Sequence, residues 1–224
     1  MLLLFAGPTL YRARAMGPLD LRQVTVLPPA IRGAVERVVR QRPGRPGTLA
    51  LVDGTFHLGT LAVGHAELRR ALEAGWQVWG LSSMGAIRAR ELASLGMRGY
   101  GEVFTQFCGP GDFTDDEVAL LHEPAPPYRE LSEPLCHLRV GLQDLERSGA
   151  LTTADCAQIL EELTALWFGD RTLRFALDRL AAVGVPAVVR DEWLRGFDRY
   201  RVKSVDLLRF LRDRPFAPTP LAQP

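Results

Sequence analysis

Residues 77–92 read Gln77-Val-Trp-Gly-Leu-Ser-Ser-Met-Gly-Ala-Ile-Arg-Ala-Arg-Glu-Leu92, and this stretch decides the fold. Its first five residues form an apolar run typical of a buried strand, and a helical pattern begins at Met84. Similar short apolar runs occur at residues 2–6, 24–27, 49–52 and 118–121. Further helical patterns occur at residues 31–40 and 61–74, and the one that starts at Met84 extends to residue 95. Strands that alternate with helices predict an α/β fold with a small, mostly parallel sheet and crossover helices.

The pattern changes at Tyr128, after which no strand-like run is found. Helical patterns follow at residues 132–147, 153–167, 171–183, 190–200 and 204–212. We therefore predict three parts, of which the second is all-helical and contains Lys203. They are an α/β core over residues 1–127, a helical region over residues 128–216 and a disordered tail over residues 217–224.

Composition excludes several classes of protein. An apolar content of 47% with 24% charged residues is typical of a globular protein, and a net charge of +1 provides no basic surface for nucleic acid. The three cysteines are widely spaced, which argues against a disulfide framework or a zinc site and favours the cytoplasm. The apolar start is too short for a signal peptide, and no stretch is long enough to cross a membrane. We expect no metal and no cofactor.

Two serines follow the strand that ends at Leu81. Active sites of open α/β sheets lie at the carboxyl ends of strands, and the amides of a following helix can stabilise an oxyanion. Neither Ser82 nor Ser83 satisfies the Gly-x-Ser-x-Gly pattern of a nucleophile elbow. A structural interpretation is therefore open, with one serine capping the helix and Gly85 needed for packing. The spacing does not choose between the two serines.

Lys203 is the only lysine among 27 basic residues. Arginine cannot replace lysine where a proton must be lost, so a retained lysine is a candidate general base. On a helical projection Lys203 shares a face with Leu207 and Phe210, which predicts that it points toward the core. An uncharged lysine amine so placed could deprotonate a serine. The alternative is a long side chain that only covers a packed surface.

The remaining polar candidates are weaker. Arg88 and Glu91 lie on the apolar face of their helix, where they could pair with each other or orient a substrate carboxylate. His65 lies on the apolar face of another helix and is predicted to be a core histidine. Asp53 ends a buried strand and could line the same site as the serines or belong only to a turn. Residues 115–117, Asp-Asp-Glu, are predicted to be a solvated turn and not a metal site.

Several segments together resemble the TfuA-like family. They are Phe5-Ala-Gly-Pro-Thr-Leu10, Pro28-Pro-Ala-Ile-Arg-Gly33, Asp53-Gly-Thr-Phe56, His65-Ala-Glu67, Gly80-Leu-Ser-Ser-Met-Gly-Ala-Ile-Arg-Ala-Arg-Glu-Leu92, Asp115-Asp-Glu-Val-Ala119 and Arg129-Glu-Leu-Ser-Glu133. They follow the family's order, and the stretch from Ser82 to Leu92 is the most specific. A looser match surrounds Lys203-Ser-Val-Asp206.

The resemblance implies a role beside YcaO-type enzymes, which convert a peptide backbone amide into a thioamide with consumption of ATP. TfuA-like partners are understood to hydrolyse a thiocarboxylate on a small ThiS-like sulfur carrier protein, which releases sulfide. They are also understood to strengthen the hold of the YcaO enzyme on its precursor peptide. A serine–lysine pair is the family's proposed hydrolytic centre.

On this chain the resemblance assigns the pair to Lys203 and either Ser82 or Ser83. We favour Ser83, which is next to the helix start. Where the family commonly has a lysine between His65 and Glu67, this chain has Ala66, so a base at that position is lost. Thr9 replaces a more usual serine and keeps a hydroxyl group.

The resulting hypothesis is that uncharged Lys203 accepts the serine proton, while amides of residues 83–85 hold the oxyanion. Four further side chains are expected to contact the carrier tail or to support the pair, namely Asp53, His65, Arg88 and Glu91.

Two other functions remain open from the sequence. One is a non-catalytic adaptor that binds YcaO and its peptide. The other is a small-molecule serine hydrolase that uses His57 or His65 together with Asp53.

Overall fold

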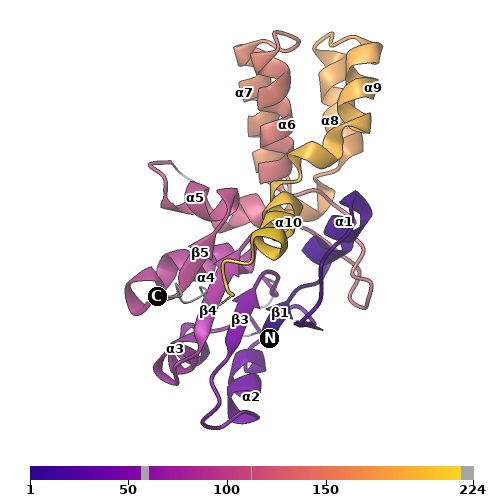
Figure 1. The fold of residues 1–224 in the computed structure, drawn as a ribbon. Coiled ribbons are helices and arrows are strands. Elements are labelled where there is room, and N and C mark those ends of the chain that lie inside the picture. Colours follow the sequence, from indigo (N-terminus) through magenta and orange to yellow (C-terminus); the bar gives the residue numbers. More distant parts are fainter. Residues whose placement is uncertain (57–60, 112, 218–224) are drawn as a thin grey trace, which may run out of the picture.

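A computed structural model describes residues 1–56, 61–111 and 113–217. Its centre is a sheet of five strands in the order β2-β1-β3-β4-β5, and every hydrogen-bonded pair is parallel (Figure 1). The strands are β1 (Leu2–Phe5), β2 (Val24–Leu27), β3 (Thr48–Leu51), β4 (Gln77–Leu81) and β5 (Arg98–Tyr100). The predicted parallel α/β architecture is confirmed.

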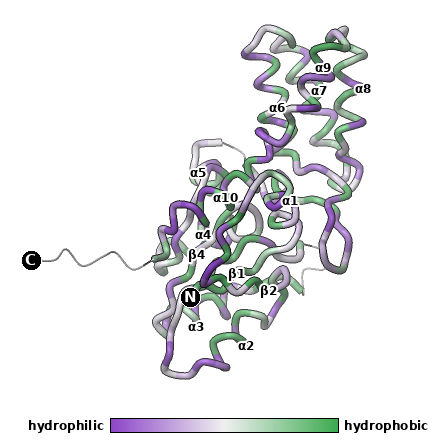
Figure 2. The backbone as a smooth tube through the Cα atoms, turned by 45° about the vertical axis from the view of Figure 1, so that its right-hand side comes forward, coloured by the Kyte–Doolittle hydropathy of each residue, from purple (hydrophilic) through white to green (hydrophobic). Residues whose placement is uncertain are grey.

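Helices cover both faces of the sheet, and this explains why the central strands are apolar over most of their length. One face packs against α2 (Ala34–Arg40), α3 (His65–Glu73) and α4 (Met84–Glu91). The other face packs against α1 (Pro8–Met16) and α10 (Val202–Asp213). Figure 2 shows the strands as hydrophobic segments surrounded by helices of mixed character.

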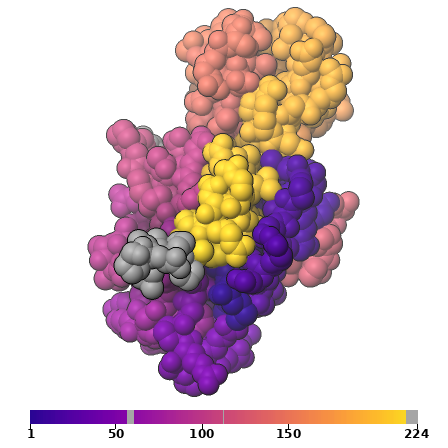
Figure 3. Space-filling view, in the orientation of Figure 1, coloured from indigo at the N-terminus to yellow at the C-terminus, as the bar shows by residue number. Residues whose placement is uncertain are grey.

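The helical half contains four longer helices with an apolar core of their own. These are α6 (Leu135–Arg147), α7 (Thr153–Ala165), α8 (Leu173–Ala182) and α9 (Ala187–Arg195). They project from the sheet as an arm, whereas α10 returns to lie beside α1 on one face of the sheet (Figures 1 and 3). Lys203 is therefore on the helix that joins the arm to the α/β part. Within the described ranges, no helix has the length and apolarity needed to cross a bilayer.

The structure differs from prediction in one strand and two helices. Residues 118–121 are not a strand of the sheet: Val118 ends the 3-10 turn Asp115–Val118, and the bridge that follows, between His122 and Glu130, is isolated from the sheet. The fifth strand is instead β5, whose three residues are too few to show an apolar pattern. Two short helices were not predicted, namely α1 and α5 (Glu102–Cys108). Of the predicted tail, residues 218–224 lie outside the described residues.

Candidate functional site

The strand order places a crevice between the carboxyl ends of β1 and β3, because the chain reverses its direction across the sheet at this point. Open parallel sheets bind their ligands at such a switch point. Asp53 follows β3 here, and its carboxylate accepts hydrogen bonds from the amides of Gly7 (2.8 Å) and Thr9 (3.1 Å). It also accepts one from the Thr9 hydroxyl (2.6 Å). Asp53 thus fixes the start of α1 beside the crevice.

Replacing Asp53 with alanine is expected to lower the free energy of unfolding by about 2–4 kcal/mol, since two buried amides and a hydroxyl would lose their partner. Urea unfolding of wild type and variant measures the difference. The Asp20→Ala variant is the control, because the half-exposed carboxylate of Asp20 bonds at the surface to Arg22, through its side chain and its amide, and pairs with Arg214. Equal stability of the Asp53 variant and this control would contradict the role of Asp53 as a cap.

A cavity of about 320 Å³ opens at this edge of the sheet. Its polar side chains include Asp53, Ser83, His122 and Lys203, and its apolar wall comes mainly from the chain segment after the 3-10 turn. The other lining residues are Pro8, Gly54, Thr55, Phe56, Val118, Ala119, Leu120, Leu121, Pro124 and Phe168. Ser83 and Lys203, which are far apart in the sequence, therefore share one cavity.

The two serines have different roles in the structure. Ser82 is fully buried, does not line the cavity and donates its hydroxyl to the main-chain carbonyl of Lys203 (2.8 Å). Its φ of 66° lies in the left-handed region, so the chain turns sharply as it leaves β4. Ser83 lines the cavity, and among the described residues no group hydrogen-bonds its hydroxyl. It stands at the N-cap of α4 without making a capping bond.

Two glycines bring this turn close to the sheet. A Cβ on Gly80 would lie 2.0 Å from the carbonyl oxygen of Gly85, and one on Gly85 would lie 1.7 Å from that of Leu51. The Gly85 amide donates to the Val52 carbonyl (3.1 Å), so it is already occupied. The Met84 amide has no acceptor among the described residues, which leaves it available to an oxyanion near Ser83.

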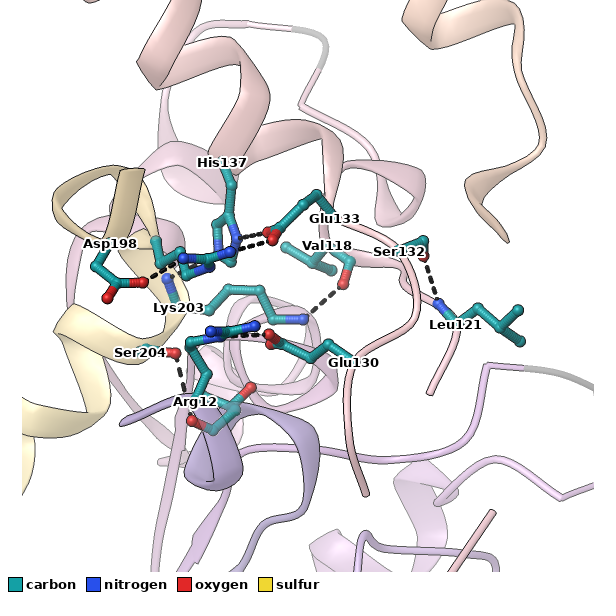
Figure 4. Close-up of polar contacts among 12 residues, drawn as sticks. Arg12, Val118, Leu121, Glu130, Ser132, Glu133, His137, Asp198, Lys203 and Ser204 are labelled. Atoms are coloured by element: carbon teal, nitrogen blue, oxygen red, sulfur yellow. Dashed lines mark hydrogen bonds and ion pairs between the residues drawn. The ribbon is translucent and has the colours of Figure 1, made fainter. Parts of the chain in front are cut away.

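Lys203 is almost completely buried, with 1% of its surface exposed. Its Nζ donates to the carbonyl of Val118 (2.8 Å), and no carboxylate oxygen of the described residues lies within 4.0 Å of it. Figure 4 shows the side chain extended between the Arg12–Glu130 pair and the Glu133–His137 pair. The predicted orientation toward the core is confirmed, and the amine is held by a neutral acceptor instead of an ion pair.

Buried charges hold the start of α10 in place. Arg201 pairs with Glu133 and Asp198, and Glu133 also accepts a hydrogen bond from Nδ1 of His137 (3.1 Å). The Lys203 amide donates to Nε2 of the same ring (3.4 Å), so His137 is neutral with its proton on Nδ1. Burial raises the pKa of Glu133, but His137 and Arg201 outweigh this effect and lower it to about 2.

The contribution of His137 to stability should fall as the pH is lowered from 6.5 to 4, while Asp206, whose pKa burial raises to about 6, contributes in the opposite direction. Burial lowers the pKa of His137 to about 4, although the hydrogen bond to Glu133 opposes the shift. The unfolded chain therefore binds a proton at His137 below about pH 6.5, whereas the folded chain binds it only near pH 4, so protons favour unfolding between these values. The expected loss is up to about 3 kcal/mol.

Urea unfolding at several pH values from 7 to 4 measures this loss. The His137→Gln variant should show a smaller decrease over the same interval, whatever its stability at pH 7. An unchanged pH dependence in that variant would show that other groups cause the loss.

Besides Ser82 and Gly85, three predicted site residues lie outside the cavity. His65 pairs with Glu91 (2.7 Å), and Glu91 also pairs with Arg88 (2.6 Å), as one of the two interpretations of that helix predicted. The prediction of a core histidine is wrong, because the His65 side chain is 55% exposed at the first position of α3. Arg88 additionally donates to the Val63 carbonyl. His57 lies outside the described residues.

The acidic run at residues 115–117 is a 3-10 turn with two ion pairs. Asp116 pairs with Arg171, and the buried Glu117 pairs with Arg139, so the predicted solvation is wrong for Glu117. The described residues contain no group of three or more potential metal ligands. Both ion pairs anchor the turn that presents the Val118 carbonyl to Lys203.

Sequence reasoning missed the cavity residues Leu120, His122 and Phe168. Leu120 belongs to the run at residues 118–121 that was assigned to the sheet, His122 follows that run directly, and Phe168 lies in a 3-10 turn, Phe168–Asp170. No motif identifies such residues, since only the return of α10 to the sheet brings the wall next to Lys203.

A protein-family model matches part of the chain. The model described as TfuA-like protein matches residues 53–172, which include Asp53, Ser82 and Ser83 and end before Lys203. No curated protein matches the chain.

Proposed function

The chain belongs to the TfuA-like family, and we propose that it is a serine–lysine hydrolase that releases sulfide from a thiocarboxylated, ThiS-like carrier protein. The sulfide would serve a YcaO-type enzyme that thioamidates a precursor peptide, whose binding to YcaO the protein would also strengthen. The observation that carries the proposal is that Ser83, with no partner for its hydroxyl among the described residues, and buried Lys203 line one cavity.

The mechanism needs an uncharged Lys203. Its amine accepts the proton of Ser83, and the alkoxide attacks the thiocarboxylate carbon while the Met84 amide donates to the oxyanion. The carbon–sulfur bond then breaks, and the lysine returns its proton to the leaving sulfur. Water, deprotonated by the same lysine, attacks the acyl-enzyme and releases the carrier carboxylate and Ser83. Sulfide leaves more readily than an amine, so this step requires little acid assistance.

Ser82 fits a positioning role in this scheme. Its hydrogen bond to the Lys203 carbonyl joins the strand end to the start of α10, so it holds nucleophile and base at the same cavity. Ser83 and Lys203 are not hydrogen-bonded in this structure, and such contacts commonly tighten only when substrate is bound.

Sulfide release from a thiocarboxylated carrier tests the proposal directly. Several carriers should be tried with the wild-type protein and with aryl esters as a comparison. Release from a carrier with little ester turnover supports the proposal. No release from any carrier would contradict it.

A non-catalytic adaptor is the second candidate, and the projecting arm favours it. Helices α6–α9 form a separate apolar core and expose Val188 (62%) and Leu194 (40%), which a partner could cover. A gain in the affinity of YcaO for its peptide, with no hydrolysis of any carrier, would support this function. The small-molecule hydrolase is not favoured, since His65 pairs with Glu91 and Asp53 caps α1.

A further inference from the structure

The wall segment, residues 119–122, is a short extended chain with only one paired edge. Within the segment, the Leu121 carbonyl accepts a hydrogen bond from the Leu131 amide (2.8 Å). Just after it, the Glu123 amide donates to the Arg129 carbonyl (2.9 Å). His122 and Glu130 form an antiparallel bridge between these two bonds. Successive residues of an extended chain direct their main-chain groups to opposite sides. Leu120 and His122 therefore direct theirs away from this pairing.

The main-chain groups of Leu120 and His122 have no partner among the described residues. Both residues line the cavity. The Val118 carbonyl, at the end of the 3-10 turn that precedes the wall segment, accepts the hydrogen bond of Lys203 Nζ. The open edge of the wall segment thus lines the cavity, and the lysine amine is held at the residue that precedes this segment.

We propose that the C-terminal segment of the protein substrate binds as an added strand on this open edge, pairing with the main chain of Leu120 and His122. The position of its reacting carbonyl group at Ser83 and Lys203 rests on the proposed function. The main-chain donors and acceptors of an extended peptide match the unpaired groups of the edge, whereas a folded surface cannot reach them.

The cavity itself requires a narrow chain end. At about 320 Å³ it is at the lower end of the usual range for ligand pockets, about 300–1,000 Å³. Ser83 and Lys203 are 3% and 1% exposed, so only a chain end can reach them. Main-chain pairing places few demands on side chains, which fits a terminus of small residues.

An N-methyl scan of the substrate tests the proposal without altering the protein. Synthetic hexapeptides that end in diglycine would carry one N-methyl group at each successive amide, and calorimetry would measure their binding as carboxylates. An added strand uses every second amide, so methylation should weaken binding about tenfold at alternate positions and much less between them. Equal losses at successive amides, or no loss at any, would overturn the proposal.

A protein variant tests the same edge from the other side. Leu120→Pro removes the amide that should pair with the substrate, whereas Leu120→Ala shortens the side chain and keeps that amide. The proline variant should bind the peptide about tenfold more weakly than the alanine variant, provided that both unfold cooperatively near the wild-type temperature. Equal binding by two folded variants would contradict the pairing.

The two proposals can fail separately in these experiments. Alternating binding losses, without sulfide release from the same hexapeptides prepared as thiocarboxylates, would retain the added strand and overturn the proposed hydrolysis. Sulfide release without alternation would retain the hydrolysis and overturn the added strand.

Discussion

Replacement of Lys203 by arginine should reduce sulfide release by at least about 10³-fold, because a guanidinium stays charged and cannot accept the proton of Ser83. Lys203 is the only lysine of the chain, so no other amine can substitute for it. Its amine lies in the same cavity as Ser83, and a carbonyl holds it there. The measurement is the rate of sulfide release from a thiocarboxylated carrier at saturating concentration.

The arginine variant must be shown to fold, because its longer side chain has to fit a buried position. Lys203→Met provides a second variant of similar length without a charge, and it should be equally inactive. Circular dichroism and thermal unfolding report on the fold of both. A folded variant of either kind that releases sulfide at the wild-type rate would rule out Lys203 as the base.

Replacement of Gly85 by alanine should destabilise the fold by more than about 4 kcal/mol, the largest stability effect that we expect from a single substitution. The new Cβ would lie 1.7 Å from the Leu51 carbonyl oxygen. That oxygen belongs to the backbone of a central strand, so it cannot move aside as a flexible side chain could. For a chain of this size the expected decrease in melting temperature is about 10 °C or more.

Gly17→Ala is the matched control for this substitution. A Cβ on Gly17 would meet no atom within 4 Å, and its φ of 165° is extended backbone that any residue adopts. Its melting temperature should be close to that of the wild type. Equal melting temperatures of Gly85→Ala and Gly17→Ala would contradict the close contact between α4 and β3.

The sequence predicts the parts of the fold that repeat a pattern. Strands β1, β3 and β4 are apolar over most of their length because both of their faces are buried, and this is visible in the residues themselves. The three-residue strand β5 and the short helix α1 carry no comparable pattern, and tertiary packing alone decides their structure. Residues 118–121 look like a strand because they are apolar, yet they line a cavity instead.

In the candidate site, too, some features could be predicted from a sequence pattern, whereas others depend on tertiary contacts. The position of Ser83 after a strand and the burial of Lys203 could both be predicted, from the switch to a helical pattern and from the face shared with Leu207. The surroundings of His65 could not be predicted. A helical projection shows the face on which a residue lies but not whether a neighbouring element extends far enough to cover it. Nor could the role of Ser82 be predicted, since it depends on a hydrogen bond to a residue more than a hundred positions away.

The most direct test of Ser83 as the nucleophile is sulfide release by Ser83→Ala, measured beside Ser82→Ala with a thiocarboxylated carrier. Ser83 lines the cavity with no partner for its hydroxyl among the described residues, whereas the Ser82 hydroxyl is buried and bonded to Lys203. We predict that Ser83→Ala abolishes release and that Ser82→Ala retains part of it, since Ser82 only positions the base. Release at the wild-type rate by a folded Ser83→Ala protein would contradict the account.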